Sequence, residues 1–270
     1  MRRAWHEAGR QTGPTGKLIR PHIHVPFGRL PEFAPVLGRH GLDIELYVQG
    51  SDMDTLGADW LRQTMGLLDY RPELSIHAPF MDLSPGAVDD KVRAVTMSRF
   101  ERALEMARAL GAATVVFHSG YEKWKYAMRV DIWLEKSVLT WGPLIEKARK
   151  DGIRIAVENI FEDSPENLIA LFGRLGCANF GLCFDTGHFN LFTKSPLEAW
   201  LGPLKKYLIE MHLHDNDGSH DAHRPIGEGR FPFQTLFNEV RGLGNVVHTI
   251  EAHSPADALE SLKRLQRFLY

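Results

Sequence analysis

The most informative stretch of this 270-residue chain is Phe180-Gly-Leu-Cys-Phe-Asp-Thr-Gly-His188. An apolar run ends at the carboxylate of Asp185, and the imidazole of His188 follows three residues later. The apolar run predicts a buried strand, and both side-chain types are common metal ligands. In parallel α/β barrels, functional groups gather at the carboxyl ends of the strands. The stretch therefore predicts one part of an active site.

Short β-rich runs alternate with helical patterns on both sides of this stretch, from about residue 18 onward. The expected strands are Leu18–Pro26, Leu42–Val48, Leu74–His77, Thr114–His118, Ile153–Asn159, Phe180–Thr186, Tyr207–His214 and Val246–Ala252. Apolar residues at helix-like spacing mark the clearest helices, which are Lys91–Leu110, Trp133–Arg149, Asn167–Leu175 and Ala256–Phe268. Glycines predict where helices stop, at Gly41, Gly111 and Gly152.

Eight strands that are each followed by a helix are typical of a (β/α)8 barrel, an α/β fold in which parallel strands close into a ring. An open, doubly wound sheet also alternates strands and helices, but no Gly-rich phosphate-binding fingerprint follows the first strand. Polar residues at several strand ends favour the barrel, with its functional site at the C-terminal mouth. We therefore predict one barrel domain over residues 18–270, preceded by a loosely ordered polar tail over residues 1–17.

The composition narrows the class of protein. Hydrophobic residues make up 44% of the chain, which is enough for a large core and argues against wholesale disorder. The formal net charge of -2 gives no general attraction to nucleic acid. The 2 cysteines are too few for a disulfide framework, and no stretch resembles a membrane span or a secretory signal. We therefore predict a cytoplasmic location and no membrane partner.

Several of the 13 histidines fall at or just beyond predicted strand ends, together with carboxylates. The residues in these positions are His77, His118, Glu158, Asp185, His188, His212, His214, Asp221, His223 and Glu251. A ring of buried carboxylates repels itself unless cations neutralise it, and mixed imidazole and carboxylate ligands suit zinc, manganese or a similar divalent ion. The sequence therefore predicts a metal site at the barrel mouth. Hydrogen-bonded structural roles are expected instead for His22, His40, His220 and His248.

The loop after the seventh predicted strand contains two further signals. An extended backbone over Asp221-Ala-His223 would point both ligands to one side, because alternate side chains share a face. The sequence Ile226-Gly-Glu-Gly229 predicts a tight turn that brings the backbone close to a bound ligand. The sequence leaves open whether five more side chains near the mouth pack in the barrel or line the substrate site: His24, Glu45, Phe80, Trp124 and Phe189.

These residues resemble those of the xylose isomerase-like TIM barrels, including the endonuclease IV (AP endonuclease family 2) branch and the sugar-phosphate isomerase/epimerase branch. The resemblance runs from about His77 through Glu251, with a weaker match in the first two strands. Endonuclease IV-like members use nine ligands for three zinc ions, which by motif would be His77, His118, Glu158, Asp185, His188, His212, Asp221, His223 and Glu251. The mononuclear epimerases use a smaller set, which would be Glu158, Asp185, His212 and Glu251. The resemblance thus implies one to three divalent ions, with zinc favoured and manganese as the alternative.

Two loops depart from the endonuclease IV pattern. The loop after the second strand, Val48-Gln-Gly-Ser-Asp-Met-Asp-Thr55, is acidic and lacks the Arg-Trp element that the resemblance would supply for reading DNA. The loop from His212 to Asp221 is also short against that pattern. Together with the net charge, these departures disfavour nucleic acid as a partner and favour a small carbohydrate or sugar phosphate.

The preferred hypothesis is a metal-dependent sugar or sugar-phosphate isomerase or epimerase, in which a proton moves next to a carbonyl through a metal-stabilised enediolate. Glu158 and Glu251 would act as the catalytic acid and base, and His188 would bind or polarise a substrate oxygen. Contacts to the rest of the substrate are expected from three residues: His214, Trp124 and, for a phosphate group, Arg224.

Two other functions remain open. The first is endonuclease IV-like phosphoester hydrolysis at a trinuclear zinc site, in which Glu158 bridges two ions and Glu251 completes the cluster. The second is a barrel that binds metal or sugar without catalysis. The number of bound metal ions would discriminate between these functions.

Overall fold

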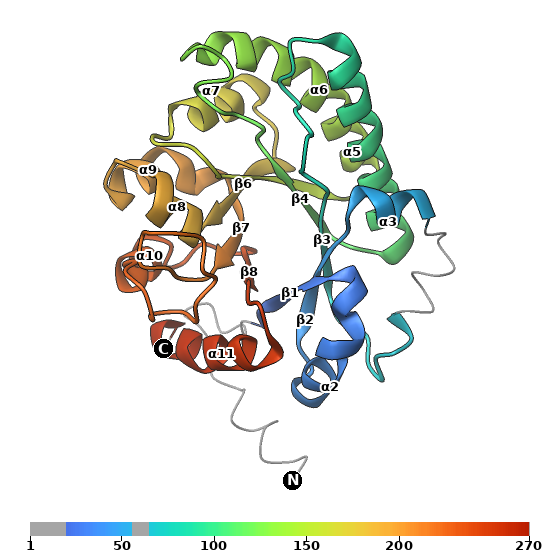
Figure 1. Ribbon diagram of the computed structural model, residues 1–270, viewed down its shortest axis with the longest axis vertical. Coiled ribbons are helices and arrows are strands. Elements are labelled where there is room, and N and C mark those ends of the chain that lie inside the picture. The colour runs from blue at the N-terminus through green and yellow to red at the C-terminus, as the bar shows by residue number, and fades with distance from the viewer. Residues whose placement is uncertain (1–19, 56–64, 270) are drawn as a thin grey trace.

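The structure, a computed structural model, describes residues 20–55 and 65–269. Eight parallel strands form a closed barrel in which each strand pairs with the next along the chain, and β8 pairs with β1 (Figure 1). The strands are β1 (His22–Pro26), β2 (Asp43–Tyr47), β3 (Leu74–His77), β4 (Thr114–His118), β5 (Arg154–Glu158), β6 (Phe180–Asp185), β7 (Leu208–Leu213) and β8 (Val247–Ile250). The fold is therefore the predicted (β/α)8 TIM barrel.

Helices surround the barrel on its outer side (Figure 1). The α-helices are α2 (Leu30–His40), α3 (Gly50–Thr55), α5 (Asp90–Leu110), α6 (Val130–Lys150), α7 (Glu166–Leu175), α8 (Thr186–Phe192), α9 (Leu197–Leu204), α10 (Phe233–Glu239) and α11 (Pro255–Leu269), with 3-10 helices η1 (Phe27–Arg29) and η2 (Lys205–Tyr207). Their inner faces pack against the strands, and the largest fully buried side chains of this core include Trp133, Trp141 and Trp200.

The observed strands lie within or match the predicted runs, and several ends agree. Over the described residues, β3 and β4 coincide with the predictions, and the other strands are shorter by one to three residues. Two of the predicted helix stops are C-caps in the left-handed conformation, Gly41 with φ 59° and Gly111 with φ 73°. Leu18, Ile19 and the predicted tail over residues 1–17 lie outside the described residues.

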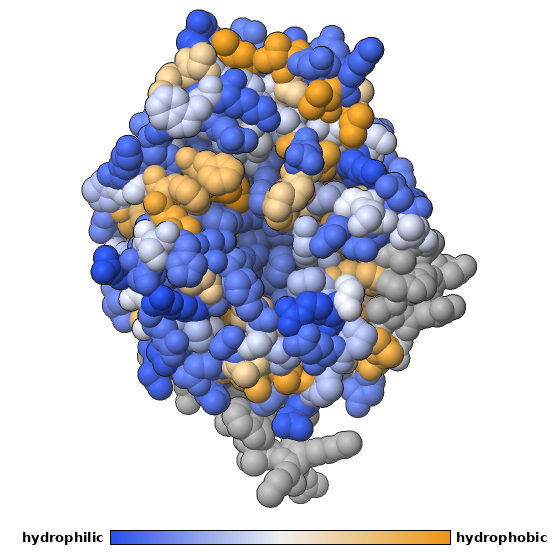
Figure 2. All heavy atoms as spheres, in the orientation of Figure 1, coloured by the Kyte–Doolittle hydropathy of each residue, from blue (hydrophilic) through white to orange (hydrophobic). Residues whose placement is uncertain are grey.

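The strand register brings polar residues side by side at the C-terminal end of the barrel. The laterally paired residues include His24 with Glu45, Tyr47 with His77, His118 with Glu158, and Asp185 with His212. Figure 2 shows a hollow at the centre of the barrel, and its floor is hydrophilic. The fold therefore converts the polar strand ends of the sequence into one continuous polar surface.

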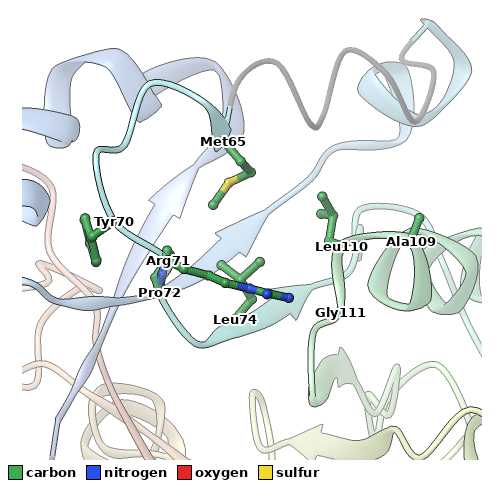
Figure 3. A pocket seen from close by; sticks show the side chains of 8 residues that line it. All are labelled: Met65, Tyr70, Arg71, Pro72, Leu74, Ala109, Leu110 and Gly111. Carbon is green, nitrogen blue, oxygen red and sulfur yellow. The ribbon is translucent and has the colours of Figure 1, made fainter.

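A separate cavity lies near the beginning of β3, at the opposite end of that strand from His77 (Figure 3). Its volume is about 320 Å³, and it is lined by Met65, Tyr70, Arg71, Pro72, Leu74, Ala109, Leu110 and Gly111. None of the metal-ligand residues predicted from the sequence lines this cavity. This cavity therefore lies apart from the residues predicted to form the site.

Within the described part of the chain, no helix has the length and apolar character needed to cross a bilayer.

Candidate metal centre

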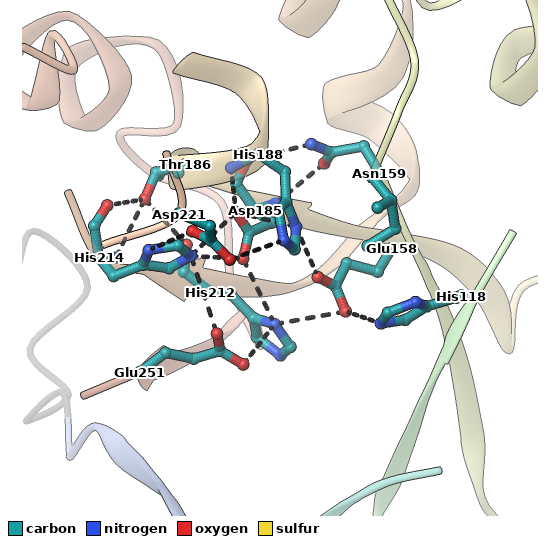
Figure 4. Close-up of polar contacts among 12 residues, drawn as sticks. His118, Glu158, Asn159, Asp185, Thr186, His188, His212, His214, Asp221 and Glu251 are labelled. Carbon is teal, nitrogen blue, oxygen red and sulfur yellow. Dashed lines mark hydrogen bonds and ion pairs between the residues drawn. The ribbon is translucent and has the colours of Figure 1, made fainter. Parts of the chain in front are cut away.

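All nine residues predicted as metal ligands, together with His214, lie in one cluster at the carboxyl ends of β3 to β8 and in the adjoining loops. Figure 4 labels all of them except His77 and His223. The parallel strands explain this gathering, because their carboxyl ends all open at the same mouth. The chain therefore brings together six strand ends that are far apart in the sequence.

Glu158 lies at the centre of the cluster, and its two oxygens face different groups of imidazoles. Its Oε2 lies 3.1 Å from Nε2 of His77 and 3.4 Å from Nε2 of His118. Its Oε1 lies 3.0 Å from Nδ1 of His188, on α8. A carboxylate placed in this way can bridge two cations.

His212 is surrounded by carboxylates on the side of its Nδ1 atom. This nitrogen lies 3.5 Å from Oε2 of Glu158, 3.7 Å from Oδ2 of Asp185 and 3.3 Å from Oε1 of Glu251. It is buried and makes no hydrogen bond to any of the described residues. In a tetrahedral zinc site with bonds of about 2.1 Å, neighbouring ligand atoms lie about 3.4 Å apart. Each of the three oxygens therefore lies close to the ligand-to-ligand spacing from Nδ1.

The third group of predicted ligands lies on the outer side of the cluster. Oδ2 of Asp221 lies 3.4 Å from Nε2 of His188 and 3.0 Å from Nε2 of His223. The prediction of an extended Asp221-Ala-His223 segment is wrong, because His223 has φ 45° and adopts the left-handed region. Asp221 and His223 thus lie close together with His223 in a left-handed conformation, and not through the alternation of side chains along a strand.

Imidazoles and carboxylates shift each other's proton affinity throughout the cluster. Burial raises the pKa of Glu158, but the His212 and His118 imidazoles oppose it and hold the pKa well below its usual range. Burial also raises the pKa of Glu251, but His24, His212 and other imidazoles outweigh it and lower this pKa to about 2. Protons on imidazoles thus compensate the carboxylates, and a divalent cation would compete with these protons for the same donor atoms.

His188 shows the opposite shift. Burial lowers the pKa of this imidazole, but Asp185, Asp221 and Glu158 raise it well above the usual value. With no cation beside these carboxylates, the net effect favours the protonated, charged form of the His188 imidazole. The cluster therefore attracts positive charge strongly, as a cation site requires.

Residues that the sequence analysis missed hold the strand ends in place. Asn159 spans β5 and β6, since its Nδ2 donates to the Asp185 carbonyl at 3.0 Å and its Oδ1 accepts from the Asp185 amide at 2.9 Å. The Thr186 hydroxyl donates to the His214 carbonyl at 2.7 Å and so ties β6 to β7. The side chain of Asp185 caps α8 by accepting from the His188 amide at 2.6 Å. Asn159 and Thr186 are the last residues of their predicted strands, and these polar strand ends were the available sequence signal.

Asp215 holds the loop that carries Asp221 and His223. Its carboxylate accepts backbone hydrogen bonds at 2.8–3.1 Å from Gly227, Gly229, Arg230 and Phe231. Its backbone pairs with Arg224 in an antiparallel bridge, which folds the intervening loop back. The turn at Ile226–Gly229 therefore packs against Asp215 and Asn216, and a Cβ atom at Gly229 would lie 2.1 Å from the Asn216 carbonyl oxygen. Its approach to a ligand stays a prediction.

The three residues expected to contact substrate lie in different environments. His214 is fully buried, with Nε2 at 3.0 Å from Oδ2 of Asp185. Arg224 is half-exposed and donates to Oδ2 of Asp217 at 2.7 Å. Trp124 is 76% exposed, and none of its described contacts joins it to the cluster. Their contact with substrate remains a prediction.

The side chains that the sequence left open are now placed. His24 and Glu45 reach the cluster, with His24 Nδ1 at 2.8 Å from Oε1 of Glu45 and 3.1 Å from Oε1 of Glu251. The Phe80 ring stacks on His118, with ring centroids 4.1 Å apart. Phe189 packs against Phe184, Trp200 and Phe231 in the core. Phe80 thus forms part of the mouth, whereas Phe189 is a packing residue.

The histidines expected to be structural lie apart from the cluster where their contacts are described. Nδ1 of His22 lies 2.9 Å from the Ser75 hydroxyl, and Nδ1 of His248 lies 3.0 Å from the Val246 carbonyl. His220 contacts the hydroxyl of the adjacent Ser219. These contacts fit the hydrogen-bonded roles that the sequence predicts for them.

A family model described as the xylose isomerase-like TIM barrel matches residues 43–269. The chain belongs to this family. The resemblance found in the sequence is therefore confirmed. The chain is also 32% identical over 219 residues to an uncharacterized protein of Methanocaldococcus jannaschii, MJ1311, and the match covers 77% of this chain and 74% of that protein.

Two solved structures cover nearly the whole barrel. A D-tagatose 3-epimerase-like protein is 28% identical, with a TM-score of 0.77 over 92% of this chain and 97% of that one. The TTHB071 protein of Thermus thermophilus, soaked with ZnCl2, is 26% identical, with a TM-score of 0.75 over 93% of this chain and 98% of that one.

Proposed function

We propose that this protein is a divalent-metal-dependent isomerase or epimerase of a sugar or sugar phosphate. The observation that carries the proposal is the position of His212 Nδ1, which faces oxygens of Glu158, Asp185 and Glu251 at 3.3–3.7 Å without a hydrogen bond. These residues are the set that the resemblance assigns to the mononuclear epimerases. The likeness to a D-tagatose 3-epimerase-like protein supports a carbohydrate substrate.

The donor set suits zinc or manganese, because imidazole and carboxylate groups together surround each candidate position. The principal ion would be held by Glu158, Asp185, His212 and Glu251. When bound, the ion would polarise carbonyl and hydroxyl oxygens of the substrate and stabilise the negative charge that develops on them. The zinc-soaked relative supports zinc as the ion to test first.

Proton transfer falls to the two glutamates in this proposal. Glu158 and Glu251 come from β5 and the end of β8, and both contact the same edge of the His212 ring. The neighbouring imidazoles keep both carboxylates ionised, so each can accept a proton from a substrate carbon. His188 would orient a substrate oxygen from the side of α8, and Arg224 would hold a phosphate group if the substrate carries one.

The two cysteines support the cellular location that we propose. Cys177 and Cys183 are both free thiols, and a reducing compartment preserves such thiols. We therefore include a cytoplasmic location in the proposal.

Hydrogen exchange at carbon tests the reaction directly. The metal-loaded protein is incubated in D2O with a panel of ketoses, aldoses and their phosphates, and NMR follows deuterium entering next to the carbonyl. We expect exchange with at least one sugar, and at least a 100-fold loss in Glu158→Gln and in Glu251→Gln. Glu166→Gln, at an exposed position at the start of α7, is the matched control and should retain the rate. Exchange with none of the sugars would overturn the proposal.

A second function is favoured by one specific observation. Glu158 contacts four imidazoles, those of His77, His118, His188 and His212, as a carboxylate that bridges ions would. This arrangement supports phosphoester hydrolysis at a trinuclear zinc site. All nine residues that the resemblance assigns to three zinc ions lie in this cluster. The loop after the second strand and the loop from His212 to Asp221 depart from the DNA-binding pattern, so another phosphoester is the expected substrate for this activity.

Metal analysis separates the two functions. Three zinc ions per chain, with cleavage of a chromogenic phosphodiester, would favour the hydrolase. One ion per chain, with carbon-bound deuterium exchange and an intact diester, would favour the isomerase or epimerase.

A further inference from the structure

Glu45 is a fully buried carboxylate on β2 that lies beside the candidate metal centre but outside both ligand sets. Its two oxygens contact imidazoles from two different strands. Oε1 lies 2.8 Å from Nδ1 of His24, which is its register partner on β1. Oε2 lies 3.2 Å from Nε2 of His212 on β7, across the barrel interior. Glu45 therefore connects the first part of the barrel to the central imidazole of the cluster.

The two nitrogens of His212 have different partners. Nε2 has hydrogen-bond geometry with Glu45, whereas Nδ1 has no hydrogen bond among the described residues and faces three carboxylates. An ionised carboxylate only accepts hydrogen bonds, so its partner nitrogen must carry the proton. With the proton fixed on Nε2, a neutral His212 directs the lone pair of Nδ1 toward the ion position.

We propose that Glu45 is the positioning residue of the metal centre, fixing both the proton and the ring orientation of His212 so that Nδ1 is available to a divalent cation. This inference rests on the proposed function only in requiring that the cluster binds a metal. A hydrogen-bonded carboxylate also raises the basicity of a ligating imidazole. Glu45 would thus increase metal affinity without touching the ion or the substrate.

A purely structural role for Glu45 has different consequences. In that case the contact with His24 would simply join β1 to β2, and the loss of Glu45 would reduce stability without altering metal affinity. The two roles are separable because His24 and His212 contact different oxygens of the same carboxylate.

Zinc affinity is the first measurement, by competition of the metal-free full-length protein with a chromophoric chelator. We expect Glu45→Ala to weaken zinc binding by about 10–100-fold, the usual range for loss of such a partner. Glu45→Gln keeps an oxygen acceptor of the same length and should recover most of this loss, with less than a tenfold effect. Thermal unfolding of the metal-free variants checks that each is folded, and the near-isosteric Glu45→Gln keeps the test available if the alanine variant is not.

Glu162→Gln is the matched control. Glu162 is another buried glutamate, in the loop after β5, and its carboxylate accepts hydrogen bonds from the Ser119 hydroxyl, the Ile160 amide and the Asn167 side chain. None of these described hydrogen bonds joins it to Glu45 or His212. Its replacement should leave zinc affinity within about threefold of the starting protein.

A second readout follows the proton itself. In zinc-loaded protein labelled with ¹⁵N-histidine, NMR should show an Nε2–H of His212 that exchanges slowly with water. The signal should persist in Glu162→Gln and exchange at least tenfold faster in Glu45→Ala. Unchanged affinity together with a protected Nε2–H in Glu45→Ala would overturn the inference. Failure of the starting protein to bind zinc at all would instead overturn the metal-dependent function.

Discussion

Gly187 packs directly against the imidazole of His214, so that a Cβ atom at residue 187 would lie 2.0 Å from Cε1 of that ring. His214 is fully buried and its Nε2 contacts Asp185, so a shift of the ring would disturb this contact. Glycine at this position therefore allows the end of β6 and the end of β7 to approach each other at the candidate metal centre.

The first prediction is that Gly187→Ala destabilises the protein by about 1–3 kcal/mol, because a buried methyl group forces ring and backbone to shift. It should also weaken zinc binding, since Asp185 and His188 lie on either side of the substitution. Urea unfolding and chelator competition measure the two effects. Gly173→Ala in α7, where nothing lies within 4 Å of the added Cβ, is the control and should be neutral or slightly stabilising. Equal stability of the two variants would contradict the prediction.

The second prediction concerns the loop that carries Asp221 and His223. Asp215→Asn should destabilise the protein by about 1–3 kcal/mol, because one carboxylate oxygen that accepts backbone N–H groups becomes an NH2 donor. Asp217→Asn removes a more exposed carboxylate from the same loop, where solvent screens its ion pair with Arg224, and should destabilise the protein less than Asp215→Asn. Urea unfolding of the two variants under the same conditions checks the difference. A larger loss for Asp217→Asn would show that Asp215 does not hold the loop.

The third prediction is a pH dependence that arises away from the metal centre. Burial lowers the pKa of His248 from 6.5 to about 4 in the folded protein. The unfolded chain therefore binds one more proton at His248 than the folded protein does between about pH 6.5 and 4. The contribution of His248 to the free energy of unfolding falls as the pH falls through this window, and it does not change above the window. The maximal slope from one proton is about 1.4 kcal/mol per pH unit.

Replacement of His248 by Phe should remove this contribution. The difference in unfolding free energy between His248→Phe and the starting protein should change between pH 7.5 and 4.5, in favour of the variant at the lower pH. Urea unfolding at several pH values measures it, and titration of the metal cluster cancels because both proteins contain it. A difference that is independent of pH would contradict the assignment of a neutral buried His248.

The fourth prediction is that zinc stabilises the folded chain. A ligand that binds only the folded state adds about 2.7 kcal/mol when its free concentration is 100 times its Kd. Thermal unfolding of protein treated with a chelator, before and after zinc is restored, should show a higher Tm with zinc. His212→Gln should abolish most of the increase, whereas His248→Phe should retain it. A Tm that does not respond to zinc would contradict metal binding at the cluster.

Much of the barrel could be predicted because each strand end carries its own local signal. His77 and His118 end β3 and β4 at the predicted residues, since a buried apolar run is followed directly by a polar side chain. The helix stops at Gly41 and Gly111 are equally local, because the left-handed conformation suits glycine. Local sequence therefore determined the elements and the mouth at which they open.

The lateral contacts could not be read in this way. The pairing of His24 with Glu45, and of Glu45 with His212, depends on the register and closure of the ring, and residues 45 and 212 are far apart in the chain. Asp215 looked like one more acidic loop residue, although its carboxylate gathers four backbone N–H groups. The sequence predicts an extended backbone at His223, but the residue has a positive φ. Its conformation is accompanied by contacts with distant parts of the chain, which the local sequence does not reveal.

The closure of the barrel has a further consequence. β1 and β8 pair at only two positions, His22 with Thr249 and Ile23 with Ile250, whereas β1 and β2 pair along five. Just beyond this short seam, His24 Nδ1 lies 3.1 Å from Oε1 of Glu251. An ion held by Glu251 and by residues of β5 to β7 would therefore link the end of β8 to these strands near the seam. Metal binding would then reduce local opening of the barrel, and amide exchange in β8 would be slower in the metal-bound protein.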